Sequence, residues 1–339
     1  INIYQQGQIQ QALDSAKQLL SQFPNSFKLY NIQGAAYSGL GQFDAAVDSY
    51  KQALKIKSDY AEVYYNMGNA LLGKGDLKAA IDSYKQAIKI KPDFAEAYYN
   101  MGAALNDRGD LEAAIDSYEQ AVKIKPDYAE AYYNMGNALN DKGDVEVAIN
   151  SYKQALKIKP DYAEAFNNLG LALKNKGDLK AAIDSYKQAL KIKPDSAEAF
   201  NNMGNALKDK GDLESAISSY KQAISIKLDY AEAYYNIGAV LKDKGDLEVA
   251  IDSYKQAIKI KPSYAEAHNN IGSALRGKGD LEAAIDSYKQ AIKIKPDYAE
   301  AYNNMGVALK DKGDLEAAID NFKQAIKIKP DYAEAYNNM

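Results

Sequence analysis

The 339-residue sequence contains no cysteine and no tryptophan, and its single histidine is His268. Without cysteine, neither a disulfide framework nor a thiol nucleophile can form. One histidine cannot supply the usual histidine and cysteine ligands of zinc, and it has no catalytic cysteine to pair with. The sequence therefore predicts a protein that is not an enzyme, with no metal and no cofactor, and the lack of thiols fits a cytoplasmic location.

A strong charge of one sign is also missing. Lysine and arginine number 42 against 46 aspartates and glutamates, which gives a formal net charge of −4 at pH 7. Nucleic-acid binding needs a clustered positive surface, so no nucleic-acid partner is predicted. No apolar run reaches the ~20 residues that span a membrane, and no signal-peptide pattern follows Ile1, so no membrane partner is predicted either.

Repetition is what the sequence has in abundance. One glycine recurs at intervals of 34 residues without insertion or deletion. A fixed period of about 20 to 50 residues is typical of a solenoid built from small units. The glycines of this series are Gly34, Gly68, Gly102, Gly136, Gly170, Gly204, Gly238, Gly272 and Gly306.

Residues 95–128 represent the unit, and positions are counted from its first residue. Two segments with apolar residues at helical spacing are separated by Gly109, which favours the left-handed conformation that ends a helix. Asp93 and Asp110 precede the two segments and are expected to cap them. Pro126 ends the second segment. Each unit is therefore predicted to be a helix pair, helix A followed by helix B.

Small residues occupy positions on the apolar stripes where bulky side chains would be usual. Gly102, Ala114 and Ala121 are of this kind, and we expect the helix backbones to approach one another closely there. A serine also recurs in helix B and is expected to be a surface hydroxyl rather than a nucleophile. It stands at Ser83, Ser117, Ser151, Ser185, Ser219, Ser253 and Ser287.

The unit resembles the tetratricopeptide repeat. That family has an aromatic residue at positions 4 and 24, glycine at 8, alanine at 20 and proline at 32. Here these positions hold Tyr98, Tyr118, Gly102, Ala114 and Pro126, although the frequent tryptophan of the family is absent. The resemblance covers the whole chain and implies an all-α fold, a right-handed superhelical solenoid of antiparallel helix pairs.

The repeat boundaries follow from the same count. Residues 1–26 are expected to form a partial repeat, mainly its helix B, and residues 27–332 form nine complete repeats. Residues 333–339 would begin a further helix A. Because the chain starts at Ile1 without methionine and stops inside this predicted helix, we expect it to be a fragment of a longer protein.

One stripe of helix A lines a concave groove in the tetratricopeptide family, and the resemblance implies the same use here. Position 6 of this stripe is asparagine in eight successive units, and an amide can bond the backbone of an extended peptide of any sequence. The row resembles the asparagine ladder in the arm of O-linked N-acetylglucosamine transferases. Alternatively, the amides bond between neighbouring helices. The row consists of Asn66, Asn100, Asn134, Asn168, Asn202, Asn236, Asn270 and Asn304.

Positions 5 and 12 of the same stripe divide the chain. Tyrosine at position 5 predicts exposed aromatic surface mainly in the first half, whereas basic residues at position 12 predict mixed charge in the second half. With glutamate at position 2 in most units, the first half would suit a basic ligand. The tyrosines are Tyr65, Tyr99, Tyr133 and Tyr235, and the basic residues are Lys174, Lys208, Lys242, Arg276 and Lys310.

These patterns predict a protein-interaction scaffold that holds a protein or peptide as an extended segment in the groove. Two alternatives stay open. The chain could be the substrate-recruiting arm of a larger enzyme such as a glycosyltransferase, or a module that stacks end to end through residues 315–339.

Overall fold

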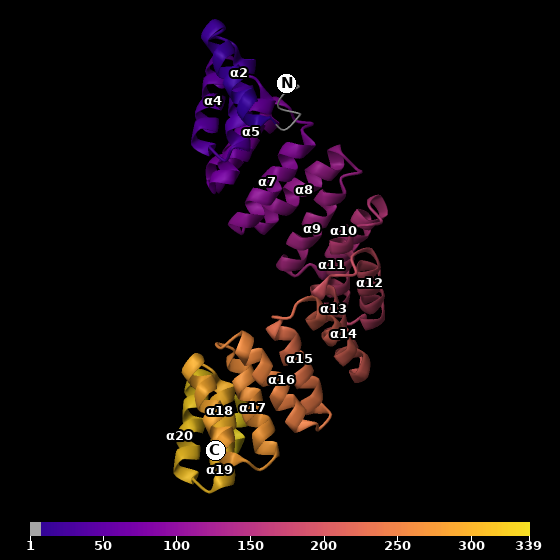
Figure 1. Ribbon diagram of the computed structural model, residues 1–339, viewed down its shortest axis with the longest axis vertical. Helices are drawn as coiled ribbons and strands as arrows, with labels where there is room; N and C mark the ends of the chain where they lie inside the picture. Colours follow the sequence, from indigo (N-terminus) through magenta and orange to yellow (C-terminus); the bar gives the residue numbers. More distant parts are fainter. Residues whose placement is uncertain (1–7) are drawn as a thin grey trace. The chain divides into compact units, whose positions relative to one another are not determined.

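The computed structural model describes residues 8–339 as helices joined by short turns, with no strand in that range. Residues 1–7 of the predicted partial repeat lie outside the described residues. Helices A and B alternate along the chain (Figure 1). The A helices are α3 (Phe27–Gly39), α5 (Ala61–Lys74), α7 (Ala95–Arg108), α9 (Ala129–Lys142), α11 (Ala163–Asn175), α13 (Ala197–Asp209), α15 (Ala231–Asp243), α17 (Ala265–Gly277), α19 (Ala299–Lys312) and α21 (Ala333–Asn338). The B helices are α2 (Ile9–Gln22), α4 (Phe43–Ile56), α6 (Leu77–Ile90), α8 (Leu111–Ile124), α10 (Val145–Ile158), α12 (Leu179–Ile192), α14 (Leu213–Ile226), α16 (Leu247–Ile260), α18 (Leu281–Ile294) and α20 (Leu315–Ile328).

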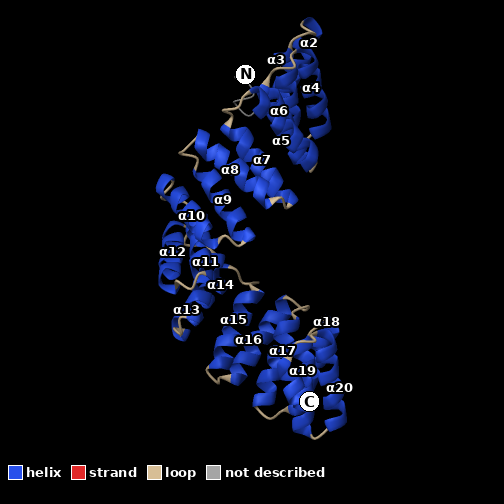
Figure 2. Cartoon of the chain, turned by 180° about the vertical axis from the view of Figure 1, so that it is seen from behind, coloured by secondary structure: helices blue, strands red, loops and turns tan. Residues whose placement is uncertain are grey.

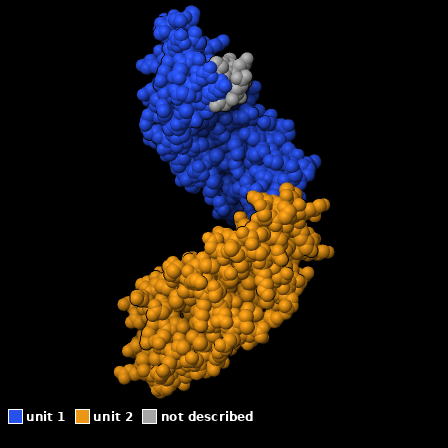
Figure 3. All heavy atoms as spheres, viewed as in Figure 1, with its two compact units in different colours: residues 1–176 blue, residues 177–339 orange. Residues whose placement is uncertain are grey.

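The chain divides into two compact units, one ending at Lys176 and the other beginning at Gly177 (Figure 3). Within each unit, an A helix packs against the B helix that follows it, and that B helix packs against the next A helix. Short turns join consecutive helices, so the two helices of a pair run antiparallel (Figure 2). The predicted all-α solenoid of helix pairs is confirmed, and each repeat contacts mainly its neighbours in sequence.

Within each compact unit, the helix pairs are built around an aromatic ring of helix B. Tyr118 is buried, and a Cβ atom added to Gly102 of α7 would lie only 2.8 Å from its ring. Ala114 and Ala121 on the same B helix are fully buried. The predicted close approach of helix backbones at small residues is therefore confirmed, because only a residue without a side chain leaves room for the ring.

The turn between helices A and B follows the prediction in its backbone. Gly109 has a φ of 89°, in the left-handed region, directly after α7. Asp110 is the N-cap residue of α8, but its carboxylate pairs with Arg108 and accepts nothing from the helix N-terminus. In other units the expected cap forms, as where Asp280 accepts from the Ala283 N–H at 3.2 Å. The aspartate thus has two competing partners at this turn.

The predicted cap of helix A is wrong. The N-cap residue of α7 is Phe94 rather than Asp93, and no side chain accepts a hydrogen bond from the first turn. Phe94 is buried in a cluster with Ala61, Ala87 and Ala97. Packing of the aromatic ring therefore fixes where the helix begins, and Asp93 is left in the preceding turn.

The recurrent serine of helix B is not the surface hydroxyl that the sequence suggested. It is buried in several repeats, and the Ser117 Oγ donates to the Ala113 carbonyl at 2.7 Å. A serine hydroxyl that bonds to the backbone carbonyl four residues earlier is satisfied within its own helix. The residue is therefore a packing element of helix B, and it has no free hydroxyl for nucleophilic chemistry.

Candidate functional site

The candidate site is the helix-A face, the stripe of the A helices that carries positions 2, 5, 6, 9, 12 and 13. All eight predicted asparagines at position 6 are half-buried there. Asn134 Nδ2 donates to the Tyr99 hydroxyl at 2.9 Å, and Asn236 Nδ2 donates to the Asn201 amide oxygen at 3.0 Å. The same bond, to position 5 of the preceding A helix, is made by Asn66, Asn100, Asn168, Asn270 and Asn304.

These bonds are the structural role that the sequence left open for the asparagine row. Seven of the eight amide nitrogens bridge two successive A helices of the same compact unit, so they link neighbouring repeats. The bonds also hold each amide in one orientation. Contact between the row and a ligand is untested and stays a prediction.

The expectation of exposed tyrosines at position 5 is wrong. Tyr99 is half-buried, with its ring centroid 6.0 Å from that of Tyr118 and 4.9 Å from that of Tyr128. Burial raises the pKa of the Tyr99 hydroxyl, and the bond from Asn134 partly offsets this effect. The rings of Tyr65, Tyr133 and Tyr235 pack in the same way. Position 5 thus belongs to the helix interface, which explains why asparagines at this position are buried: Asn167, Asn201, Asn269 and Asn303.

The basic residues at position 12 differ in their surroundings. Lys174, Lys208 and Lys242 are half-buried, whereas Arg276 and Lys310 are exposed. Arg276 pairs with Asp311 at 2.7 Å, and Lys310 donates to the Asn338 carbonyl at 3.2 Å. Positive charge is therefore present in the second half of the chain, but part of it is already neutralised by the protein itself.

Sequence reasoning missed a second recurrent feature beside the asparagine row. At eight of the turns between repeats, a lysine lies over an aromatic ring, whereas the turn after Lys193 has Ser196 in place of the ring. Lys125 Nζ is 4.5 Å from the centroid of the Tyr128 ring and 3.8 Å from a carboxylate oxygen of Glu96. The signal that could have found it is the recurring Lys-Pro-Asp-Tyr sequence, followed by glutamate two residues into helix A.

Open clefts lie at two of these turns. One of about 430 Å³ is lined by Glu198, Asn202, Lys227, Tyr230 and Glu232, so it adjoins the asparagine row. An equivalent cleft of about 400 Å³ is lined by residues that include Glu266, Lys295, Tyr298 and Glu300. The first cleft presents two carboxylates, one ammonium group and one aromatic ring, and the second adds the Asp297 carboxylate and the Lys329 ammonium group to the same set.

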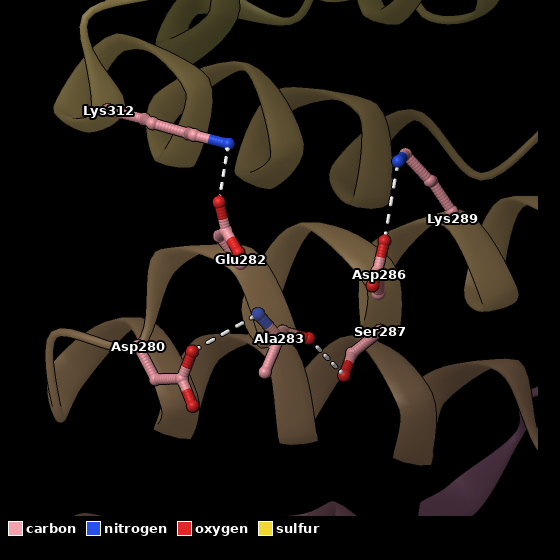
Figure 4. A network of polar contacts seen from close by, with 7 residues as sticks. All are labelled: Asp280, Glu282, Ala283, Asp286, Ser287, Lys289 and Lys312. Carbon is pink, nitrogen blue, oxygen red and sulfur yellow. Dashed lines mark hydrogen bonds and ion pairs between the residues drawn. The ribbon is translucent and has the colours of Figure 1, made fainter.

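Other surfaces offer little chemistry. Among residues 8–339, no three histidines, cysteines, aspartates or glutamates gather closely enough to hold a metal ion. His268 is half-buried, and burial lowers the pKa of its imidazole. The exposed sides of the B helices carry ion pairs such as Lys289 with Asp286 on α18, 3.3 Å apart (Figure 4). Exposed pairs of this kind contribute little to stability.

No helix in the described part of the chain combines the length and the apolar character that crossing a membrane requires.

Comparisons with known proteins agree with the helix pairs. The family model for the cilia and flagella-associated protein 70 C-terminal domain matches residues 4–225. Models of the tetratricopeptide repeat match residues 239–276, 272–313 and 299–332. No curated protein matches the chain.

Solved structures include similar helical arrays. The APC/C hetero-tetramer Cut9–Hcn1 is 15% identical, with a TM-score of 0.56, over 96% of this chain and 80% of the other. PilF of Pseudomonas aeruginosa is 19% identical, with a TM-score of 0.54, over 62% and 95%. MamA is 32% identical, with a TM-score of 0.45, over 49% and 97%. The family models and the helix pairs together establish that the chain belongs to the tetratricopeptide repeat family.

Proposed function

We propose that the chain is a protein-interaction scaffold that binds an extended peptide segment along its helix-A face. Membership of the tetratricopeptide repeat family supports an interaction scaffold. The observation that supports the peptide is the row of half-buried asparagines, whose nitrogens are tied to the preceding A helix, as in the 2.9 Å bond from Asn134 to Tyr99. Side chains that are ordered before binding lose less conformational entropy when a ligand arrives.

The clefts beside the row supply places for ligand side chains. The cleft of about 430 Å³ has Glu198 and Glu232 on its rim and Lys227 between them in sequence. Carboxylates outnumber ammonium groups there, so a lysine or arginine of the peptide is favoured over an aspartate or glutamate. The proposed ligand is therefore an extended peptide with basic side chains and an uncharged backbone in contact with the amides.

Selection from a library of random 16-residue peptides tests the proposal. Peptides retained by the chain should bind the wild type and lose at least tenfold in affinity when Asn100, Asn134 and Asn168 are changed together to alanine. The matched control changes the exposed helix-B amides of the same three repeats, Gln120, Gln154 and Gln188, to alanine. The control should bind like the wild type. Equal binding by all three proteins, with helical content intact, would remove the proposal.

End-to-end association is a second candidate, supported by the apolar surface of α20. Ile319 is 38% exposed, although Ile285, at the same position of the preceding repeat, is 6% exposed. Leu315 is 59% exposed. We propose that this surface pairs with a second copy at high concentration. Changing both residues to glutamate should lower the weight-average mass in sedimentation equilibrium. A wild-type chain that stays monomeric at millimolar concentration would contradict this.

A further inference from the structure

The asparagines of the helix-A face form two sets that differ in how many amide hydrogens they use. Asn100 Nδ2 donates both to the Tyr65 hydroxyl, at 3.1 Å, and to the Asn69 Oδ1, at 2.8 Å. Asn134 Nδ2 donates only to the Tyr99 hydroxyl, at 2.9 Å. Two bonds are also made by Asn168 and Asn236, and one by Asn66, Asn270 and Asn304.

An asparagine at position 9 of the preceding A helix accepts the second bond, whereas other residues there do not, including Ser273 ahead of Asn304. Asn69 accepts the second bond of Asn100, and it is itself fixed because the Tyr84 hydroxyl donates to it at 2.7 Å. Ahead of Asn134 this position is Ala103, which has no acceptor. Asn137 and Asn205 act like Asn69, with Tyr152 and Tyr220 donating to them, whereas Ala239 acts like Ala103.

An amide carries two N–H groups, so the one-bond asparagines keep one hydrogen that no protein atom uses. A half-buried polar group without a protein partner is satisfied only by water or by a ligand. The two-bond asparagines have no hydrogen left and can offer a ligand only their oxygen. In the compact unit that ends at Lys176, the two sets alternate along the chain. Asn66 and Asn134 make one bond each, and Asn100 and Asn168 make two.

We propose that the one-bond asparagines hold backbone carbonyls of the bound peptide, while the two-bond asparagines are struts between repeats. The inference rests on the proposed peptide-binding function. It adds the register of the peptide, that is, which asparagines along the chain contact its backbone. In the compact unit that ends at Lys176, amide hydrogens available to the peptide occur at every second repeat, at Asn66 and Asn134. Position 9 is then the residue that determines specificity for the backbone, because it decides which asparagine has a hydrogen to give.

Titration of the wild-type chain with N-methylacetamide, the smallest peptide-bond analogue, tests the inference directly. Side-chain amide resonances, assigned by single substitutions, would be followed by NMR. One Nδ2 hydrogen each of Asn134 and Asn270 should shift downfield. The Nδ2 hydrogens of Asn100, Asn168 and Asn236 should change in chemical shift by at most about a quarter as much. An equal response from the two sets, or none from Asn134 and Asn270, would overturn the inference.

Exchange of position 9 provides the second measurement. Ala103→Asn supplies Asn134 with a second acceptor and should abolish its response to N-methylacetamide. It should also weaken a selected 16-residue peptide by about fivefold, the worth of one neutral hydrogen bond. Asn69→Ala should give Asn100 a response. If the responses of Asn134 and Asn100 to N-methylacetamide are unchanged in these variants, the proposed register is refuted. The proposed function would still stand if the wild type retains peptides in the selection. Failure of that selection would remove both.

Discussion

At the scale of single residues, the chain matches hydroxyls to acceptors only in some repeats. Tyr152 donates to Asn137 at 2.8 Å, but the buried hydroxyl of Tyr254 has no hydrogen-bond partner. In the last complete repeat, position 9 is Val307 and the aromatic residue of helix B is Phe322, which needs no acceptor. The helix-B tyrosine hydroxyl is thus absent in the repeat where valine replaces the asparagine that would accept its hydrogen bond.

Removal of these two hydroxyls should have opposite consequences. Tyr152→Phe loses a bond inside the helix pair and should lower the free energy of unfolding by about 1 kcal/mol. Tyr254→Phe removes a buried group that is unsatisfied and should leave stability unchanged or raise it. Urea unfolding followed by circular dichroism measures both. An equal loss in the two variants would mean that the tyrosine–asparagine bond contributes nothing.

The small residues of helix B lead to a second prediction at this scale. Ala114 is fully buried between helices, whereas its neighbour Ala113 is exposed on the same helix. Ala114→Leu should overpack the contact and lower the free energy of unfolding by about 1–3 kcal/mol. Ala113→Leu is the matched control and should change it by less than ~0.5 kcal/mol. Comparable urea midpoints for the two variants would contradict the close packing.

At the scale of helices, sequence patterns predicted ends better than faces. The glycine after helix A and the aspartate before helix B are local signals: Gly109 ends α7 as expected, and Asp110 is the N-cap residue of α8, although its carboxylate bonds to Arg108 and not to the helix. The face of helix A was harder, because an A helix such as α5 contacts B helices on two sides and also the A helices α3 and α7. A single apolar stripe cannot reveal a second buried stripe that is filled by tyrosine and asparagine. For that reason the sequence pattern alone predicts Tyr65 and Tyr99 on the surface.

The aspartate caps give a prediction for the B helices. Asp280 accepts from the Ala283 N–H (Figure 4), whereas Asp246, at the same place before α16, makes no cap bond. Asp280→Ala should lower the free energy of unfolding by about 1 kcal/mol. Asp246→Ala keeps the same change of charge and should cost less than half as much. Equal costs in thermal unfolding would show that charge at the helix end, not the hydrogen bond, is what matters.

At the scale of the whole molecule, the period of 34 residues determined most of the fold in advance. A strict repeat without insertions places every unit in the same register, so one helix pair defines them all. The pairing of asparagines across repeats was left open, because the sequence does not say which side chain faces which neighbour. The alternation at position 9 is visible at Asn69, Ala103 and Asn137. Its effect on the hydrogen bonds of Asn100 and Asn134 depends on how successive A helices pack, which the sequence does not show.

The repeated tyrosines predict how the molecule responds to alkali. Burial raises the pKa of Tyr118 and Tyr152, and that of Tyr230 to about 12, above the ordinary 10.0. The tyrosines of the unfolded chain therefore lose their protons at lower pH than those of the folded chain. Their contribution to the free energy of unfolding is fully present below pH ~10 and is lost as the pH rises through the folded-state pKa values. Tyrosinate absorbance and helical circular dichroism should change together above that pH. Full ionisation near pH 10 with the helices intact would contradict the burial.

The central claim is that an extended peptide lies along the A helices, and photo-crosslinking of a selected 16-residue peptide tests it most directly. A benzophenone group placed in turn at each end of the peptide would be activated in the complex, and the attached residues would be identified by mass spectrometry. The account predicts attachment to A helices at positions 2, 5, 6 and 9, within the same few repeats. Attachment to the exposed surfaces of the B helices, such as the region of Gln154 and Gln188, would contradict it.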